Sequence, residues 1–445
     1  MLSLTVQQDT MENSSFCNGA NTLKNCYLTF NIAEAVETYY SEALNNVFNS
    51  MDIFYSYYIE LSYEIVNSKD VYHSFYCLDC SNINDCYFCF NCNGCTNCFG
   101  CTNLNNQKYY WFDEQLTPEE YQKKFRALNL GDVEERNKWL SKAKKAWSEA
   151  IVKYIHTANS EDCSGDYIYN CKNVKNSYSM NGCENCSYCA YLNLPTIKDT
   201  YDVCYWGSDI ENCYECCVIG ASAYNLKFCQ ECWPGCSDLE YCAECRSCSN
   251  CFACVGLKKK KFCIFNKQYS EDEYKKLVIK LKNKMRNTGE YGQFFPGKLS
   301  RMAYNESVAT ELYPLKKEEA LKLGFRWTDN LPYTSGKETK KWEEIPADIE
   351  KIDDNIIKET LVCTGCQRNY KIIAQELAFY KKESIPLPRK CSNCRHVDRL
   401  ALKQPNKIYH GKCMKTGCNN EFETSFPPDT SHQVYCAECY QKEVY

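Results

Sequence analysis

Two stretches of this chain place a cysteine at every third residue, and this spacing constrains the fold more than any other feature. The complete repeat unit approximates apolar-x-Asn-Cys-x-x-Cys, as in residues 83–89 and 210–216. Weaker copies of this unit carry Val, Ser or Tyr instead of Cys. Units this short cannot bury a face alone, so they must stack on one another. Asn tolerates left-handed corners, and Cys, Val and Ser are small enough to point inward. The cysteines in phase are Cys86, Cys89, Cys92, Cys95, Cys98 and Cys101, then Cys242, Cys245, Cys248, Cys251 and Cys254.

An internal duplication frames these tracts. Residues 97–125 and 250–278 match at 11 of 29 positions without gaps, at an offset of 153. Each copy ends in a capping-box spacing, Thr117 with Glu120 and Ser270 with Glu273, which predicts a helix start. A second helical run is expected over residues 132–154. The predicted fold class is therefore mainly β, with cysteine-rich β-helical solenoid repeats interrupted by helical segments and followed by C-terminal zinc-ribbon modules. Two short solenoids or one interrupted solenoid both fit the pattern.

The expected domains follow from these boundaries. Residues 1–112 form the first cysteine-rich solenoid, residues 113–158 a helical hairpin, and residues 159–265 the second solenoid. Residues 266–345 are a helical and linker region, residues 346–400 a first zinc ribbon and residues 401–445 a second.

Three interpretations of the role of the repeat cysteines are open. The chain holds 36 cysteines, but it has no signal-like start and no apolar run long enough to span a bilayer. We therefore expect a cytoplasmic protein without a membrane partner, whose cysteines are thiols or metal ligands. In the favoured reading the repeat cysteines are small buried hydrophobes. An iron–sulfur or other metal cluster is an alternative, although the spacing departs from the ferredoxin pattern. Disulfide or redox chemistry is the third.

The carboxyl-terminal cysteines have the spacing of zinc ligands. Two C-x-x-C knuckles 24 residues apart predict one four-sulfur site, and a C-x4-C pair with a further C-x-x-C predicts another. Four sulfurs leave no position for a substrate, so we expect two structural Zn²⁺ sites. The predicted ligands are Cys363, Cys366, Cys391 and Cys394 in the first site, and Cys413, Cys418, Cys436 and Cys439 in the second.

A family resemblance supports the first of these sites. Residues 361–399 resemble the probable zinc-binding domain family, of bacterial zinc-ribbon type. The chain to residue 445 also resembles uncharacterised cysteine-rich bacterial proteins that pair this module with Asn-Cys repeats. The resemblance implies zinc ligands at the first four cysteines and implies no activity. It is carried by Cys363, Cys366, Glu376-Leu377, Phe379-Tyr380, Pro388-Arg389, Cys391, Cys394 and Arg395.

No enzyme motif is evident, because the chain lacks a phosphate-binding glycine loop, H-E-x-x-H and a nucleophile elbow. We expect no enzymatic activity and no small-molecule substrate. The leading hypothesis is a zinc-binding scaffold with a protein partner. Nucleic acid is a second candidate partner, contacted through basic residues around the first site: Arg368, Lys371, Arg389, Lys390, Arg395 and Arg399.

Charge supplies a competing hypothesis. Residues 1–110 hold 11 acidic and 3 basic residues, and residues 160–256 hold 13 acidic and 5 basic residues, so each tract has a net charge of −8. An acidic solenoid could mimic nucleic acid and bind a basic protein. A thiol-based metal or redox protein is the remaining alternative.

Overall fold

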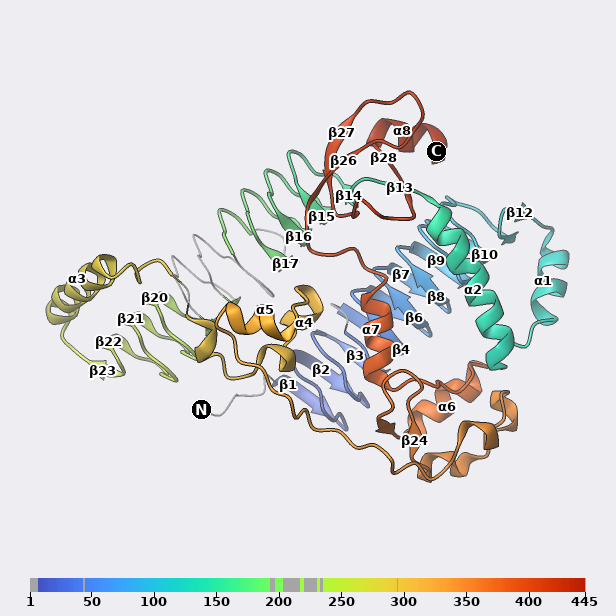
Figure 1. Cartoon of the computed structure of the whole chain (residues 1–445), viewed down its shortest axis with the longest axis horizontal. Coiled ribbons are helices and arrows are strands. Elements are labelled where there is room, and N and C mark those ends of the chain that lie inside the picture. The colour runs from blue at the N-terminus through green and yellow to red at the C-terminus, as the bar shows by residue number, and fades with distance from the viewer. Residues whose placement is uncertain are drawn as a thin grey trace.

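The computed structural model describes residues 7–42, 45–192, 197–202, 217–219, 230–232, 235–293 and 295–444. Within them the chain is mixed rather than mainly β, with one 12-stranded sheet, several small sheets and eight α-helices (Figure 1). The repeat unit at residues 210–216 lies outside the described residues.

The large sheet contains a closed ring of six parallel strands, and this corrects the predicted fold class. The ring runs β4-β5-β7-β9-β8-β6 and returns to β4, with the other strands added to it. It closes because two long strands each pair with two neighbours. The start of β4 pairs with β5 and its end with β6, while β9 pairs with both β7 and β8. The prediction of β-helical solenoids was therefore wrong, and the mimicry hypothesis loses the geometry on which it depended.

We call this assembly of β1 to β12 the barrel. Its strands are β1 (Gln7–Glu12), β2 (Ala20–Lys24), β3 (Ala35–Tyr39), β4 (Asn45–Phe54), β5 (Tyr57–Glu60), β6 (Tyr63–Val66), β7 (Lys69–Tyr72), β8 (Phe75–Leu78), β9 (Ser81–Tyr87), β10 (Thr96–Phe99), β11 (Tyr110–Trp111) and β12 (Glu114–Gln115).

The period of three has a direct structural cause in the barrel. Parallel partners lie twelve residues apart, as in Val47 with Ile59 and Ile59 with Val71. Among the described residues from Cys17 to Cys101, every third side chain is buried inside. One position before each of these, the backbone usually has positive φ, which Asn and Asp tolerate better than most residues. The interior is narrow, so only small or slender side chains fit there.

Serine and cysteine both occupy these inward positions, and the side chains of both can donate to nearby carbonyls. The hydroxyl of Ser62 donates to the carbonyl of Glu60 at 2.7 Å and accepts from the backbone N–H of Ser74 at 3.1 Å. The thiol of Cys86 contacts the carbonyls of Asn84 at 3.4 Å and Cys95 at 3.5 Å. Each polar inward atom therefore has a partner, as buried polar groups require.

A second set of parallel strands repeats the twelve-residue register in smaller sheets. Gly165 pairs with Ser177, and Ser237 pairs with Ser249. We call β14 to β17 the second stack. Its strands are β14 (Thr157–Ala158), β15 (Gly165–Tyr169), β16 (Ser177–Asn181) and β17 (Ala190–Leu192). The strands that follow the second stack are β18 (Cys217–Ile219), β19 (Gln230–Cys232), β20 (Ser237–Glu240), β21 (Ser249–Phe252), β22 (Lys261–Ile264) and β23 (Lys267–Gln268).

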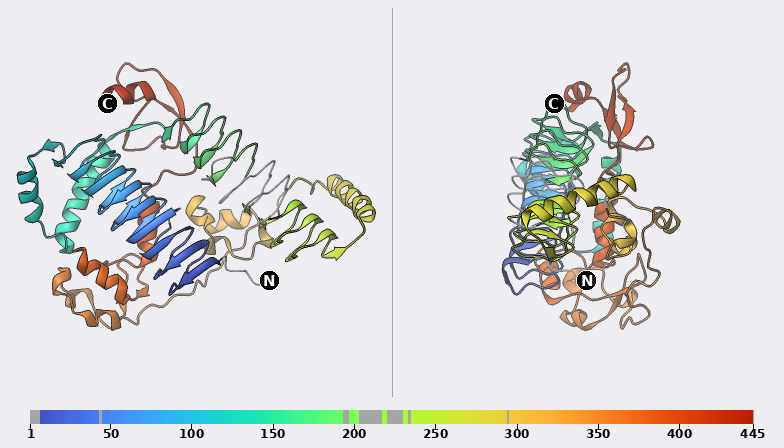
Figure 2. Two further views of the ribbon diagram at one scale, coloured as in Figure 1. Left: turned by 180° about the vertical axis from the view of Figure 1, so that it is seen from behind. Right: turned by 90° about the vertical axis from the view of Figure 1, so that its left-hand side faces the viewer.

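The predicted helix starts are confirmed. Both capping boxes form, at Thr117 before α1 (Pro118–Arg126) and at Ser270 before α3 (Glu271–Asn287). The second helical run is α2 (Val133–Glu149), which ends earlier than predicted because residues 151–153 form β13 (Ile151–Lys153). Figure 2 shows α1 and α2 at one end of the barrel, and α3 beside β20 to β23 at the other end of the molecule. Short elements follow: η1 (Gly297–Leu299), η2 (Tyr304–Glu306), α4 (Ala309–Leu312), α5 (Lys317–Lys322), η3 (Trp342–Glu344), η4 (Ile349–Lys351) and η5 (Asp354–Lys358).

The carboxyl-terminal part returns to the barrel and to the second stack. Strand β28 pairs in parallel with β13, directly after α2. Helix α7, at the end of residues 346–400, contacts β4 and so lies against the barrel wall (Figure 1). The elements are β24 (Leu361–Val362), β25 (Asn369–Tyr370), α6 (Ala374–Lys382), α7 (Ser392–Leu400), β26 (Tyr409–Lys412), β27 (Glu421–Thr424), β28 (Gln433–Tyr435) and α8 (Ala437–Val444).

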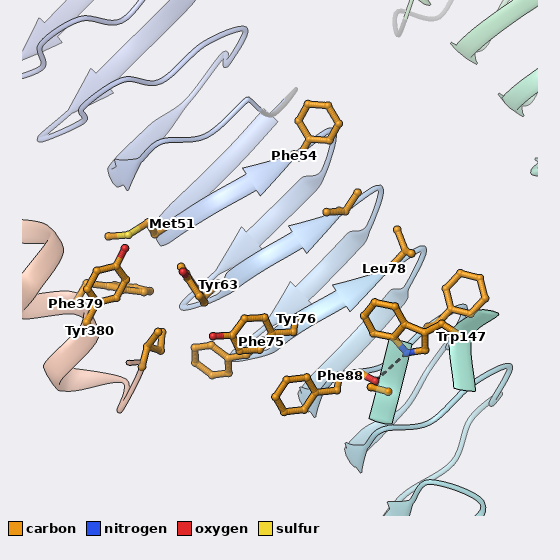
Figure 3. Close-up of a cluster of buried hydrophobic side chains, with 14 of the residues drawn as sticks. Met51, Phe54, Tyr63, Phe75, Tyr76, Leu78, Phe88, Trp147, Phe379 and Tyr380 are labelled. Carbon is orange, nitrogen blue, oxygen red and sulfur yellow. Dashed lines mark hydrogen bonds between the residues drawn. The ribbon is translucent and has the colours of Figure 1, made fainter. Parts of the chain in front are cut away.

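A large aromatic core lies outside the barrel wall, between the wall and the covering helices. Figure 3 shows Trp147 of α2 and Tyr380 of α6 packed against side chains that project outward from the barrel strands. The indole N–H of Trp147 donates to the carbonyl of Phe88 at 3.1 Å. None of the described helices is both long and apolar enough to cross a membrane.

Candidate metal centres

The first four-cysteine group joins a turn to a helix start. Cys363 and Cys366 lie in the turn after β24, while Cys391 caps α7 and Cys394 lies in its first turn. The four sulfur atoms all lie within 4.8 Å of one another, and Cys366 Sγ is 3.8 Å from Cys391 Sγ. A tetrahedral zinc ion with Zn–S bonds of about 2.3 Å would set its sulfurs roughly 3.8 Å apart. The donors and their spacing therefore fit a closed metal site.

Gly365 contributes space to this site rather than an unusual backbone conformation. A Cβ atom there would lie 3.3 Å from Cys394 Sγ and 3.7 Å from Cys363 Sγ. The left-handed residue of the turn is instead Gln367, with φ of 60°. Burial alone would raise the pKa of Cys363, but backbone N–H groups of Cys391, Cys366 and Gly365 outweigh it and lower that pKa to about 6. At Cys363 the thiolate, which is the form that binds metal, is therefore favoured, whereas burial raises the pKa of Cys391 and Cys394.

The second group repeats this plan. Cys413 and Cys418 flank a turn that contains Gly417 at φ of 83°, and Cys436 and Cys439 lie at the start of α8. Their sulfurs also lie within 4.8 Å of one another, with Cys418 Sγ 3.9 Å from Cys436 Sγ. Burial raises the pKa of Cys436, but hydrogen bonds from the Asn420 side chain and the Cys439 backbone bring it down to about 7.

A buried ionic cluster attaches the first module to the barrel. Arg395 Nε lies 2.9 Å from Asp52 Oδ2, and Arg399 Nη1 lies 2.8 Å from Asp52 Oδ1. The Asp52 side chain is fully buried, and the two arginine side chains are 6% and 1% exposed. Glu376 of α6 and Glu64 of the barrel supply further carboxylates, at 3.3 Å from Arg395 and 3.2 Å from Arg399. We call these five side chains the docking cluster.

The docking cluster changes the interpretation of the basic residues around the first site. Arg395 and Arg399 bind the barrel and are not available to phosphates. Lys390 pairs with Asp398 at 2.7 Å, and Arg389 stacks over the ring of Trp342 at 5.8 Å. Arg368 lies 4.4 Å from the centre of the Tyr333 ring. Six basic residues were expected to meet nucleic acid. Within the part of the chain that the structure describes, Lys371 alone among them is exposed and has no contact with a charged or aromatic side chain.

A mixed group beside α7 was not predicted as a unit. Glu42, Glu311 and His396 bring one ligand atom each within 4.8 Å of the others. His396 Nε2 lies 2.9 Å from Glu311 Oε2, and the imidazole packs edge-on against Phe54 at 5.3 Å. The His396 side chain is 24% exposed. Sequence offered no signal for this group, because its members lie far apart in the chain.

The described repeat cysteines occupy the interior of the barrel and of the smaller sheets from β14 to β17 and from β20 to β22. Those whose side chains the structure describes lie between Cys17 and Cys101, between Cys163 and Cys189 and between Cys236 and Cys263; they are free thiols, and all of them but Cys163 are buried. Among the described residues, the two four-cysteine sites and the Glu42 group bring at least three potential ligand atoms within 4.8 Å of one another, whereas the interior cysteines form no such group. This arrangement agrees with the favoured reading of small buried side chains.

Comparisons with known proteins add little to this picture. A comparison with protein families and another with curated proteins found no match. Among solved structures, a "putative acetyltransferase" from Desulfovibrio desulfuricans G20 aligns at 9% identity with a TM-score of 0.12. The alignment covers 55% of this chain and 62% of that one, and at this TM-score it carries no argument about fold or function. The zinc-ribbon resemblance is thus supported only in the coarser form that two four-cysteine groups can hold a metal.

Proposed function

We propose that this protein is a zinc-stabilised scaffold that binds a partner, with two structural Zn²⁺ ions at the eight carboxyl-terminal cysteines. The observation that carries the proposal is the pair of closed four-sulfur groups, each with the spacing of a tetrahedral site. When bound, zinc would crosslink each turn to its helix start. Because all four ligands are protein sulfurs, the metal has no free position for a substrate.

The position of the two sites supports a scaffold role. In each module two of the proposed ligands lie at the start of a helix that contacts the rest of the protein. Helix α7 carries the two arginines of the docking cluster, and Tyr440 of α8 accepts a 2.7 Å hydrogen bond from Asn91 of the barrel. Zinc would therefore fix the surfaces by which the modules dock. We keep residues 346–400 and 401–445 as the proposed limits of the modules.

Zinc analysis of single-cysteine variants tests this proposal. Cys391→Ser should lower the zinc content from two ions per chain to one, and limited proteolysis should then cut within residues 361–399. Cys163→Ser is the matched control, because Cys163 is partly exposed and belongs to neither site. Unchanged zinc content in Cys391→Ser, or an equal loss in the control, would contradict the proposal.

Nucleic-acid contact is a second candidate function, but a different segment favours it. Residues 256–287 hold 11 basic and 3 acidic residues, and Lys258, Lys259, Lys260 and Lys261 are all exposed. This segment includes α3 at the far tip of the molecule (Figure 1). Phosphate binding there should weaken steeply with salt. In filter binding, charge reversal of Lys259 and Lys260 should weaken RNA binding more than reversal of Arg389 and Lys390, and the opposite order would restore the zinc-ribbon tail as the contact.

A further inference from the structure

A cleft of ≈ 870 Å³ separates the barrel from the second stack. The barrel contributes side chains from β5, β7 and β9, the second stack contributes them from β15 and β16, and α8 contributes Ala437, Tyr440 and Gln441. Figure 1 shows β28 and α8 above β13 and β14. The volume lies in the range typical of sites for small organic ligands.

The floor of the cleft is a buried hydrogen-bond network that joins both walls. The Tyr167 hydroxyl, from the second stack, donates to Asp79 Oδ1 at 3.0 Å and accepts from Asn67 Nδ2 at 3.0 Å. His156 stacks on Tyr167 at 4.4 Å between ring centroids, and its Nδ1 lies 2.9 Å from Asp166 Oδ1. Because each of these groups has a partner, the two walls are held at a fixed separation before any ligand binds.

The lining is aromatic and amide-rich, with few charged groups. Its side chains include six tyrosines and seven asparagines, and its charged groups are Lys69, Lys153, His156 and Asp79. His156 and Asp79 lie together in the floor network, and Lys69 lies 3.6 Å from Asp70. Phenol rings present flat apolar faces, while amides both donate and accept hydrogen bonds. A ligand that matches this lining carries apolar ring faces and many hydroxyl groups.

The charge of the surrounding chain excludes polyanions from the cleft. The barrel wall of the cleft lies within residues 1–110, and strands β15 and β16 lie within residues 160–256; each of these tracts has a net charge of −8. A phosphate chain entering between them would meet repulsion from both sides. The single-stranded nucleic acids that stack on tyrosines elsewhere need a continuous positive groove, whereas here Lys69 lies beside Asp70 and His156 lies beside Asp79. Neutral ligands face no such penalty.

The aromatic surface continues beyond the cleft along the barrel wall. Tyr58 borders the cleft and also a neighbouring hollow of ≈ 280 Å³, which Phe48 and Tyr72 line. The Tyr58 and Tyr72 side chains are 49% and 44% exposed. Tyr169 of the second stack is 39% exposed on the opposite wall of the cleft. Exposed tyrosines on both walls suit a ligand of several linked rings better than a single small molecule.

We propose that the cleft between the barrel and the second stack binds a neutral oligosaccharide, with sugar rings against Tyr58 and Tyr169 and hydroxyl groups bonded to asparagine side chains. This inference deepens the proposed scaffold function and rests on it in one respect, since the second zinc module supplies the α8 wall.

The test uses the full chain loaded with zinc and a panel of neutral hexasaccharides: cellohexaose, maltohexaose, xylohexaose, mannohexaose and N-acetylchitohexaose. Isothermal titration calorimetry should detect binding of at least one member, with little change between low and high salt. Tyr58→Asn should weaken that binding about fivefold, since stacking on one ring contributes about 1 kcal/mol. Asparagine suits the position because Tyr58 has φ of 55°.

Tyr188→Asn is the matched control. Tyr188 also has positive φ, at 58°, and is 59% exposed, but it does not line the cleft. The control should bind like the wild type. Failure of every hexasaccharide to bind overturns the inference, as does binding that Tyr58→Asn leaves unchanged or that poly-uridylate displaces. Zinc analysis of the same samples separates the two proposals: two zinc ions without saccharide binding removes this inference and leaves the scaffold proposal standing.

Discussion

Asp52→Asn tests whether the docking cluster holds the first metal module on the barrel. Asp52 is fully buried and faces both Arg395 and Arg399 at 2.9 Å and 2.8 Å. Its backbone has φ of 59°, a left-handed conformation that asparagine also accepts. The substitution therefore removes one negative charge while it keeps the shape of the side chain and the path of the backbone.

The expected loss lies near the lower end of the range for a broken buried ion pair. Removing one partner of such a pair costs about 3–5 kcal/mol, because the other charge stays buried without compensation. Here Glu64 and Glu376 remain beside the two arginines. Burial raises the pKa of both glutamates, and the nearby Asp52 side chain raises it further. Removing the Asp52 charge favours the ionised glutamates beside the two arginines, and we expect a destabilisation of about 3 kcal/mol.

Urea unfolding followed by tryptophan fluorescence measures this loss, with zinc content recorded on the same samples. Asp70→Asn is the control, since Asp70 also has positive φ, at 54°, but lies on the surface beside Lys69. A surface pair of this kind contributes little, so the control should stay within about 0.5 kcal/mol of the wild type. If Asp52→Asn unfolds with the same free energy as Asp70→Asn, the ion pairs do not hold the module and the reasoning is refuted.

Three further predictions follow from single contacts. Gly165→Ala should destabilise by at least about 3 kcal/mol, because a Cβ there would lie 1.7 Å from the carbonyl oxygen of Ser177, whereas Gly256→Ala has open space and should cost about 1 kcal/mol in the same urea assay. Trp147→Phe should cost about 1–2 kcal/mol by leaving the buried Phe88 carbonyl without its donor, and an unchanged unfolding midpoint would show that water replaces the indole. Burial alone would lower the pKa of His156, but Asp166 and Asp79 raise it to about 9, against the opposing effect of Lys153. The charged imidazole therefore stabilises the fold by about 3 kcal/mol below pH 6.5, and this stabilisation is lost as pH rises through 9. His156→Gln should flatten that part of the plot of unfolding free energy against pH, and equal slopes for the two proteins would contradict the assignment.

The local features of this fold could be predicted from sequence because their causes are local. The capping boxes at Thr117 and Ser270 depend on residues three apart, and both form as expected. The inward phase of the cysteine tracts also follows from spacing, since one residue in three faces a narrow interior. The grouping of the eight carboxyl-terminal cysteines followed from knuckle spacing in the same way, and the structure brings each set together.

The arrangement of the strands could not be predicted in this way. Ring closure depends on β4 and β9 being long enough to pair with two neighbours each, and length is decided by packing rather than by the repeat. The same limit applies to the docking cluster. Arg395 and Arg399 are four residues apart on one helix face, which could have indicated a shared contact. Their partner Asp52 lies more than 300 residues earlier, so no spacing rule could find it.

The period of three also explains why the metal modules belong to the core of this protein. A narrow interior admits only small side chains, so the large side chains of the same strands must point outward. Phe75 and Phe88 do so on the barrel wall, and an uncovered wall of that kind would expose a large apolar surface. Trp147 from α2 and Tyr380 from α6 cover it. Since α6 lies between the two knuckles of the first site, loss of that metal should loosen the cover of the barrel, and the stability of the whole chain should depend on zinc.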